Sequence, residues 1–362
     1  MPRRRHLEPR DVIGEAVVNE AVASPKPPRS PWQRLYGAAH RLRWHWYARR
    51  AKRLPRPVIS VGNLHWGGAG KTPMVAAIAR HLTHRGLHTA ILSRGYGRQD
   101  KGVRVVSVGE GPLLGPLVAG DEPVLLAGEL PGVAIVVGSD RFEAGRHALE
   151  RIDPAPQVFL LDDGFSHLGL FRDIDLVVFP ADDPLAGGKL LPGGRLREPL
   201  AAMQRADAAL MVGMEDAAAQ QLGDTLRPFG FIGPSFSCRL ETLAAQMVRG
   251  EPLSPGSHVL LVAAIARPER FIAVARQTGF PVAEMLTFPD HHSYPDRSLR
   301  QIEKAFQESG ADAVLTTSKD RVKLLGRLDL PLAELPLRAR PTDEFWSWLS
   351  RRLDQQIAET GE

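Results

Sequence analysis

The chain of 362 residues has a single cysteine, Cys238, and no run of 18 consecutive apolar residues. One cysteine excludes an internal disulfide and a metal site built from several cysteines, and it favours a reducing compartment. The lack of a long apolar run leaves no readable transmembrane helix. Met1–Arg5 resemble the charged start of a signal peptide, but no apolar segment follows them. The sequence therefore predicts a cytosolic setting.

Acidic residues are scarce at the N-terminal end. Residues 1–56 contain fourteen Lys and Arg against four Asp and Glu, a net charge of +10, whereas the remaining 306 residues sum to −5. The basic character therefore belongs to one end of the chain, and it predicts an anionic partner there. A length of 362 residues favours two domains, and a hydrophobic content of 43% is ample for their cores.

An amphipathic helix is predicted from Trp32 to Arg53, because apolar residues recur at helical spacing on one face with arginines around it. Aromatic side chains favour the headgroup level of a bilayer and arginine pairs with anionic lipid, so one interpretation is a peripheral membrane anchor. The alternative is that this face packs on the protein's own core. Nucleic-acid binding is disfavoured, because no folded module of that class appears. The apolar face comprises Trp32, Leu35, Tyr36, Ala39, Leu42 and Trp46, and the arginines include Arg34, Arg41 and Arg49.

The most informative segment is an apolar strand that leads directly into a glycine-rich turn. Residues 58–61 supply β-branched side chains for a buried strand, and residues 74–82 supply the helix that follows. Glycines in such a turn let backbone N–H groups converge on phosphate oxygens, while Lys71 adds a charge and Thr72 a hydroxyl for Mg²⁺. The sequence therefore predicts that MgATP or MgGTP is bound by Gly67, Gly68, Ala69, Gly70, Lys71 and Thr72.

The turn departs from the standard P-loop spacing at one position. His65 stands where the pattern G-x-x-x-x-G-K-[ST] requires its first glycine. A double glycine before Gly-Lys-Thr also occurs in the deviant P-loops of ParA-like ATPases, but those carry a lysine where this chain has Trp66. A turn that binds no ligand is the third interpretation.

Strands that alternate with helices predict a doubly wound, mostly parallel α/β sheet of the P-loop NTPase kind, with a second, smaller α/β domain after it. In such sheets ligands gather at the carboxyl ends of the strands. The predicted division is a flexible extension (1–30), a basic amphipathic membrane-facing helix (31–56), a P-loop core domain (57–230), a smaller C-terminal α/β domain (231–345) and a C-terminal tail (346–362).

Carboxylates stand where a P-loop enzyme needs them. Asp162 and Asp163 end an apolar run and indicate a magnesium site, although two adjacent aspartates also occur as a turn element. Asp121 precedes a helix, as an N-cap would, but a carboxylate near a histidine also suits a general base. The sequence Asp290-His291-His292 supplies such a histidine, or alternatively part of a metal site for which no third ligand motif is present.

The segment from Gly187 to Pro199 is rich in glycine and carries Lys189, Arg195 and Arg197. This composition suits binding of an anion or a sugar. An ordinary ordered loop has the same composition, so the residues alone leave both interpretations open.

Seven motifs, in one order over about residues 32–340, together resemble the tetraacyldisaccharide 4'-kinases, which phosphorylate the lipid A precursor. The motifs are Val61-Gly-Asn-Leu-x-x-Gly-Gly-x-Gly-Lys-Thr-Pro73, Leu92-Ser-Arg-Gly-Tyr-Gly-Arg98, Gly120-Asp-Glu-Pro123, Asp162-Asp-Gly-Phe-x-His167, Leu190-Leu-Pro-x-Gly-x-Leu-Arg-Glu-Pro199, Phe288-x-Asp-His291 and Lys319-Asp-x-Val-Lys323.

The resemblance implies a P-loop kinase whose smaller C-terminal domain closes over the nucleotide loop. It implies transfer of the γ-phosphate of MgATP to the 4'-hydroxyl of a tetraacyldisaccharide 1-phosphate, with Asp121 as the base and His291 supporting it. The implied cofactors are ATP and Mg²⁺. Lys71 and Asp162 complete the implied catalytic set. The implied Mg²⁺ network comprises Thr72, Asp162, Asp163 and Glu198. Substrate contacts are expected from Asn63, Arg94, Tyr96, Arg98, Arg195 and Arg197.

The resemblance also implies a peripheral protein at the cytoplasmic face of the bacterial inner membrane, which favours the membrane interpretation of the N-terminal helix. The expected partners are the lipid A disaccharide precursor and the anionic membrane surface, with no nucleic acid and no obligate protein partner. The family usually has glutamine at Ser166 and glutamate at Ser318, and the shorter Ser166 lies near the expected magnesium site. A ParA-like ATPase switch at the membrane is the alternative function, which would hydrolyse ATP without an acceptor.

Overall fold

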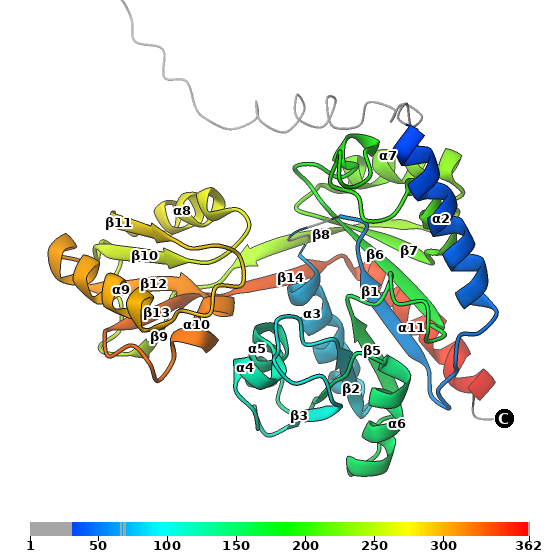
Figure 1. The fold of residues 1–362 in the computed structure, drawn as a ribbon, viewed down its shortest axis with the longest axis horizontal. Coiled ribbons are helices and arrows are strands. Elements are labelled where there is room, and N and C mark those ends of the chain that lie inside the picture. Colours follow the sequence, from blue (N-terminus) through cyan, green and yellow to red (C-terminus); the bar gives the residue numbers. More distant parts are fainter. Residues whose placement is uncertain (1–30, 66, 68–69, 361–362) are drawn as a thin grey trace, which may run out of the picture.

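The computed structural model describes residues 31–360, apart from Trp66, Gly68 and Ala69. The predicted extension 1–30 and two residues of the predicted phosphate cradle, Gly68 and Ala69, therefore lie outside the described residues. Two sheets organise the described chain (Figure 1). The larger has nine strands in the order β14-β8-β7-β6-β1-β5-β2-β4-β3, and the smaller has five in the order β11-β10-β12-β13-β9.

The large sheet is parallel except at its two edges. Strand β3 pairs antiparallel with β4, and β14 pairs antiparallel with β8. The central strands are buried on both faces, which explains their continuous apolar sequence. The strands are β1 (Val58–Gly62), β2 (Thr89–Ser93), β3 (Arg104–Val108), β4 (Ala134–Val137), β5 (Val158–Asp162), β6 (Ile174–Pro180), β7 (Ala208–Val212), β8 (Ser235–Thr242) and β14 (Leu337–Pro341).

Helices cover both faces of the large sheet. Ile59 and Val61 of β1 pack on one face with the buried side of α3, whereas Val58 packs on the other with α6. This alternation follows from the two-residue period of a strand. The helices of this unit are α2 (Pro31–Ala48), α3 (Lys71–His84), α4 (Pro116–Ala119), α5 (Asp121–Glu129), α6 (Arg141–Arg151), α7 (Asp216–Leu226) and α11 (Asp343–Thr360), with short 3₁₀ segments η1 (Ala186–Gly188), η2 (Leu200–Arg205) and η3 (Arg227–Phe229).

The smaller sheet and its helices form a second body, which we call the small-sheet unit. Its strands are parallel except β9, and Val314, Ile302 and Leu260 lie in one of its two apolar clusters. The elements are β9 (Gln246–Arg249), β10 (Val259–Ala263), α8 (Pro268–Gln277), β11 (Val282–Thr287), α9 (Asp296–Ser309), β12 (Ala313–Thr317), α10 (Ser318–Leu324) and β13 (Leu332–Leu335).

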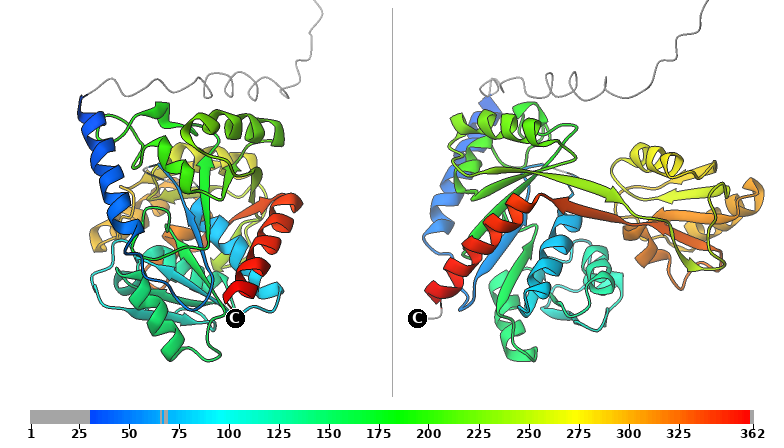
Figure 2. Two further views of the ribbon diagram at one scale, coloured as in Figure 1. Left: turned by 90° about the vertical axis from the view of Figure 1, so that its right-hand side faces the viewer. Right: turned by 180° about the vertical axis from the view of Figure 1, so that it is seen from behind.

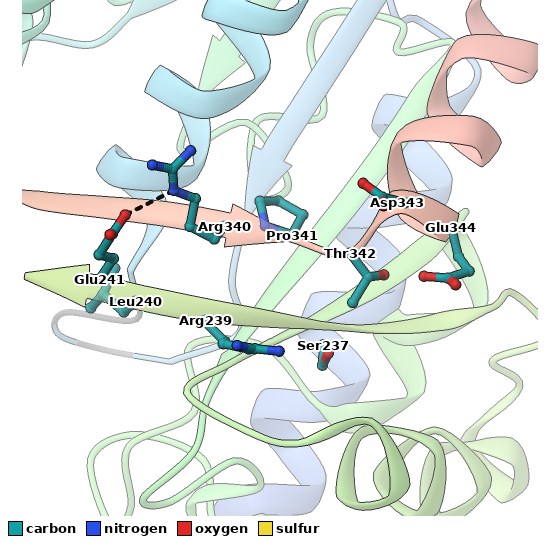
Figure 3. Close-up of a pocket in the computed structure, with 9 residues that line it drawn as sticks. All are labelled: Ser237, Arg239, Leu240, Glu241, Arg340, Pro341, Thr342, Asp343 and Glu344. Carbon is teal, nitrogen blue, oxygen red and sulfur yellow. Dashed lines mark hydrogen bonds and ion pairs between the residues drawn. The ribbon is translucent and has the colours of Figure 1, made fainter.

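Two antiparallel strands, β8 and β14, lead from the large sheet to the small-sheet unit (Figure 2). A depression lies on this linker where the two strands meet the start of α11 (Figure 3). Arg340 of β14 donates to Glu241 of β8 across it, with 2.8 Å between Nε and Oε2. None of the predicted site residues lines this depression, so it belongs to the connection between the units.

The predicted fold class is confirmed: a large, mostly parallel sheet is joined to a second, smaller one. The predicted domain ends differ from the structure. Strands β8 and β14 fall inside the predicted smaller domain (231–345), yet both pair within the large sheet. The predicted tail (346–362) is wrong over the described part, because Leu349 and Leu353 of α11 are buried in the core beneath α3.

Helix α2 contacts the large-sheet unit through Tyr36. Tyr36 is partly buried, and its hydroxyl donates to the backbone oxygen of Arg197 at 3.0 Å. Leu35, Leu42 and Trp46 are exposed. The predicted apolar face is thus divided, with Tyr36 against the protein and three large side chains toward solvent. Along the described chain, every helix is too short or too polar to traverse a bilayer.

Candidate active site

The glycine-rich turn joins β1 to α3 as the sequence predicts. Gly70 precedes α3 with φ of 80°, a left-handed conformation that glycine adopts without strain. A Cβ added to Gly70 would lie 3.1 Å from Val212 Cγ1, so the turn also packs closely on the end of β7. Lys71 and Thr72 are therefore the first residues of α3, at the end of a helix that attracts anions.

Lys71 is held by groups from two neighbouring elements. Its Nζ lies 2.8 Å from Asp163 Oδ1 and 3.0 Å from Asn63 Oδ1. Arg197 also binds both Asp163 and Asn63, with 2.9 Å between Nη2 and Asp163 Oδ1. Burial raises the pKa of Asp163, but the charges of Lys71 and Arg197 outweigh it and hold that pKa well below the usual range. Asp163 is thus an ionised carboxylate beside the phosphate cradle.

Asp162 is the last residue of β5, and its neighbours raise its pKa, whereas those of Asp163 lower the pKa of that residue. Its carboxyl is buried and accepts a hydrogen bond from Ser93 Oγ at 3.2 Å. Burial, followed by repulsion from Glu122 and Asp163, raises the pKa of Asp162 to about 7. The buried carboxyl of Asp162, repelled by two neighbouring carboxylates, therefore favours a nearby cation.

Asp121 and His291 meet across the boundary between the two units. Asp121 is the first residue of α5, and His291 lies in the loop between β11 and α9; His291 Nδ1 is 3.0 Å from Asp121 Oδ2. Burial raises the pKa of Asp121, but the hydrogen bond from His291 and the charges of Lys319 and Lys323 lower it to about 2. The hydrogen bond to Asp121 raises the pKa of His291. An imidazole and an ionised carboxylate thus form a pair suited to proton transfer.

The comparisons with known proteins identify the family of the chain. The model of a family described as tetraacyldisaccharide-1-P 4'-kinase matches residues 29–354. The tetraacyldisaccharide 4'-kinase of Geobacter sulfurreducens is 42% identical over 320 residues, which are 85% of this chain and 88% of the relative. That of Syntrophus aciditrophicus is 39% identical over 350 residues, which are 89% and 93%. The chain belongs to the tetraacyldisaccharide 4'-kinase family.

A solved structure of this family has the same fold. The crystal structure of an "apo" form of LpxK from Aquifex aeolicus in complex with ATP aligns with a TM-score of 0.72 and 33% sequence identity, covering 90% of this chain and 98% of that one. The predicted kinase activity is confirmed by these relatives. The ParA-like alternative is not favoured, because the family match spans both units of the chain.

The remaining predicted metal ligand, Glu198, is engaged by two side chains of the large-sheet unit. Its Oε2 lies 2.6 Å from Arg205 Nη2, and its Oε1 accepts from Ser166 Oγ at 2.5 Å. Ser166, one of the two expected departures from the family pattern, reaches Glu198 with its short side chain. At the other departure, Ser318 begins α10, and its hydroxyl is buried without a hydrogen-bond partner among the described residues.

The donor set next to the cradle fits Mg²⁺. Thr72, Asp162 and Asp163 offer oxygen atoms, which Mg²⁺ prefers, and a cation would relieve the repulsion that raises the pKa of Asp162. In the part of the chain that the structure describes, no three His, Cys, Asp or Glu side chains are grouped as a metal cluster. Mg²⁺ in nucleotide sites does not require such a cluster, because one or two carboxylates hold it and water and phosphate oxygens complete its coordination.

The predicted substrate residues lie in different environments. Asn63 is buried against Lys71 and Arg197, and Arg94 and Tyr96 are exposed. The Tyr96 ring lies 5.0 Å from that of His291, so it borders the Asp121–His291 pair. Two of the predicted residues are engaged elsewhere: Arg98 donates to the carbonyls of Gly102 and Lys101, and Arg195 pairs with Asp183 at 3.1 Å.

Four charged residues of the site carried no predicted role. Lys319 pairs with Glu122 at 2.8 Å, and Lys323 lies 3.7 Å from Asp121 Oδ2. Arg205 holds Glu198. Three of these residues, Glu122, Lys319 and Lys323, lie in two of the sequence motifs. The motifs do not indicate which residues they contact, because the partners are about 200 residues away in sequence. Arg205 lies in no motif, so only its position beside Glu198 identifies it.

Proposed function

We propose that this kinase transfers the γ-phosphate of MgATP to the 4'-hydroxyl of a tetraacyldisaccharide 1-phosphate, the lipid A precursor, at the cytoplasmic face of the inner membrane. The observation that carries the proposal is the Asp121–His291 pair beside the phosphate cradle. Glu122, the next residue along α5, is near enough to Asp162 to raise the pKa of Asp162. The Asp121–His291 pair therefore lies close to the carboxylates of the nucleotide site. An acceptor hydroxyl between them would face both a base and the γ-phosphate.

In this mechanism Asp121 accepts the proton of the acceptor hydroxyl as the oxygen attacks the γ-phosphorus. His291 hydrogen-bonds to the Asp121 carboxylate and keeps it oriented. Lys71 is now paired with Asp163, and it would turn its ammonium to the phosphate oxygens when ATP binds. Arg197 also contacts Asp163, so this carboxylate keeps a cationic partner when Lys71 leaves.

Thr72, Asp162 and Asp163 would hold Mg²⁺, and Mg²⁺ supplies charge neutralisation on the transferred phosphoryl group. Glu198 would act with this network through Ser166, whose loop follows Asp162 and Asp163. The substrate's sugar would contact the exposed residues Arg94 and Tyr96 at the same crevice.

A peripheral membrane position is supported by α2. Leu35, Leu42 and Trp46 present an exposed apolar stripe, and the Arg50 guanidinium lies 4.2 Å from the centre of the Trp46 ring. Apolar and aromatic side chains flanked by arginine suit the interface of an anionic bilayer. Because the acceptor is a lipid, such a helix would bring the crevice to the surface where the acceptor resides.

The test is incubation of the purified protein with γ-labelled ATP, Mg²⁺ and the disaccharide precursor in detergent. The expected result is a labelled lipid whose phosphate is on the 4' position. ATP hydrolysis that does not depend on the acceptor, with no labelled lipid, would contradict the proposal and indicate a nucleotide switch.

A further inference from the structure

The loop that follows β6 borders the phosphate cradle on the side away from the predicted magnesium carboxylates. The backbone N–H of Ala181 donates to the oxygen of Val212 at 3.0 Å, and Val212 packs on Gly70 of the cradle. Asp182 and Asp183 come next in this loop. The loop therefore lies at the carboxyl ends of β6 and β7, where ligands of doubly wound sheets bind.

Two arginines of the small-sheet unit reach this loop. Arg267, just before α8, and Arg270, in the first turn of α8, both pair with the carboxylate of Asp182; Arg270 Nη2 lies 2.5 Å from Oδ2. Two guanidinium groups thus share one carboxylate, and the charge of Glu269 also acts on Arg267. A planar guanidinium of this kind can contact phosphate oxygens and also stack on an aromatic ring.

The orientation of ATP follows from what lies on either side of β1. Strand β5, which carries Asp162, pairs with one edge of β1, and β6 pairs with the other. The γ-phosphate has to point toward the β5 side, because the Asp121–His291 pair and the predicted magnesium carboxylates lie there. The nucleoside is attached to the opposite end of the triphosphate, so it has to leave the cradle over the ends of β6 and β7.

We propose that Arg267 and Arg270 bind the nucleoside half of ATP, with their guanidinium groups against the base and the ribose. Asp182 is a positioning residue that holds both side chains at the edge of the cradle. The small-sheet unit would then contribute to both ends of the bound nucleotide: His291 beside the γ-phosphate and Arg267 with Arg270 beside the nucleoside. The inference rests on the proposed function in taking ATP as the ligand and in directing its γ-phosphate toward the Asp121–His291 pair.

The test compares ligands that share phosphates but differ in the nucleoside. Binding of ADP and of inorganic tripolyphosphate is measured, each with Mg²⁺, by displacement of a fluorescent adenine nucleotide from the full chain. In Arg267→Met and Arg270→Met we expect the Kd for ADP to rise about tenfold, while the Kd for tripolyphosphate stays within about twofold. Arg276→Met, at the exposed far end of α8, is the matched control and should leave both constants unchanged.

Two results would overturn the inference. An unchanged Kd for ADP in both arginine variants would remove them from the site. An equal loss of affinity for ADP and tripolyphosphate, reproduced by Asp182→Asn, would indicate that the ion pairs only hold the two units together. Because no acceptor is present in these measurements, they give an answer whether or not the chain phosphorylates the lipid. A melting temperature within a few degrees of the parent confirms that each variant is folded.

Discussion

Asp121 is the residue on which the proposed chemistry depends most directly. One carboxylate oxygen accepts from the backbone N–H of Glu122 at 3.0 Å, and the other faces His291 and Lys323. These partners outweigh the effect of burial and lower its pKa to about 2, so Asp121 is ionised at neutral pH. A carboxylate that is ionised and firmly oriented in this way is ready to accept a proton from a bound hydroxyl.

Replacing Asp121 with asparagine keeps the shape of the side chain and removes the base. We expect kcat to fall by roughly 10²–10⁴-fold while the KM for ATP changes little, since a general base acts on the acceptor. Steady-state kinetics with the lipid acceptor measure both constants. Asp296→Asn, at the exposed start of α9, is the matched control. If kcat of the Asp121 variant matches that of the control, Asp121 is not the base.

Asp162 should make the ligand-free protein less stable as the pH rises. Its pKa is raised to about 7 in the folded state from 3.8, so between these values the folded protein binds more protons than the unfolded chain. Stability therefore falls as pH increases through this range, and the full penalty is present above pH 7. We expect Asp162→Asn to melt several degrees above the parent at pH 8, with a smaller difference at pH 5.

Thermal unfolding at the two pH values, with and without Mg²⁺, checks this prediction. Mg²⁺ should raise the melting temperature of the parent at pH 8 more than that of Asp162→Asn, because only the parent has the buried charge for the cation to neutralise. Equal melting temperatures of the two proteins at pH 8 would show that Asp162 is not destabilising in the folded state.

At the scale of elements, α2 carries an exposed apolar surface and also contacts a residue of the active site. Tyr36 bonds to the backbone of Arg197, and the side chain of Arg197 holds Asp163. On the other side of the same helix, Leu35, Leu42 and Trp46 are 62%, 74% and 52% exposed. Exposure of three large apolar side chains on one helix is unfavourable in water, and it favours a surface that meets lipid.

Serine at Leu35, Leu42 and Trp46 together should weaken binding to anionic vesicles by at least tenfold, because about 25 cal/mol is lost for each Å² of apolar surface no longer buried. Vesicle flotation at low and high salt measures this, and the basic flank should make parental binding weaker at high salt. Ile232→Ser, at a side chain that is 85% exposed outside α2, is the control. Full vesicle binding by the triple variant would contradict a membrane role for this stripe.

The sequence predicted the elements of the site better than the contacts between them. The strand before Lys71 and the strand ending at Asp162 follow from local apolar patterns, and the structure has both. Asp121 and His291 are 170 residues apart, so local patterns carry no information on their contact, and the pairing came from the family resemblance. The prediction of a tail at residues 346–362 misses α11, because the buried face of this helix depends on a core formed by distant strands.

For the molecule as a whole, the two units meet at the active site as well as through the β8–β14 linker. Helix α10 packs on α5, where Lys319 pairs with Glu122 and Lys323 approaches Asp121. On the far side of the cradle, Asp182 pairs with Arg267 and Arg270. The Asp121 environment is therefore complete only when the small-sheet unit is docked, which would couple the arrangement of the units to the proton transfer proposed for Asp121.

Lys323 offers a test of this coupling, because it comes from the small-sheet unit and is buried. Its Nζ lies 2.9 Å from Asp320 Oδ1 and 3.7 Å from Asp121 Oδ2. In Lys323→Met, Asp121 loses a positive charge and its pKa rises, so the acidic limb of the kcat–pH profile should move upward by about one pH unit. The variant should also lose about 3–5 kcal/mol of stability, since Asp320 is left buried without its charge partner.

The double variant Asp320→Asn/Lys323→Met separates the two effects. Removing both members of the buried pair should restore much of the melting temperature, because no uncompensated charge remains in the small-sheet unit. The upward shift of the acidic limb of the kcat–pH profile should persist, because Asp121 still lacks the positive charge of Lys323. Kinetics from pH 2 to 6, the range in which Asp121 titrates, and thermal unfolding of both variants measure these outcomes. The double variant could instead regain both the parental melting temperature and the parental acidic limb of the kcat–pH profile. In that case Lys323 supports only the fold, and docking of the small-sheet unit does not change the pKa of Asp121.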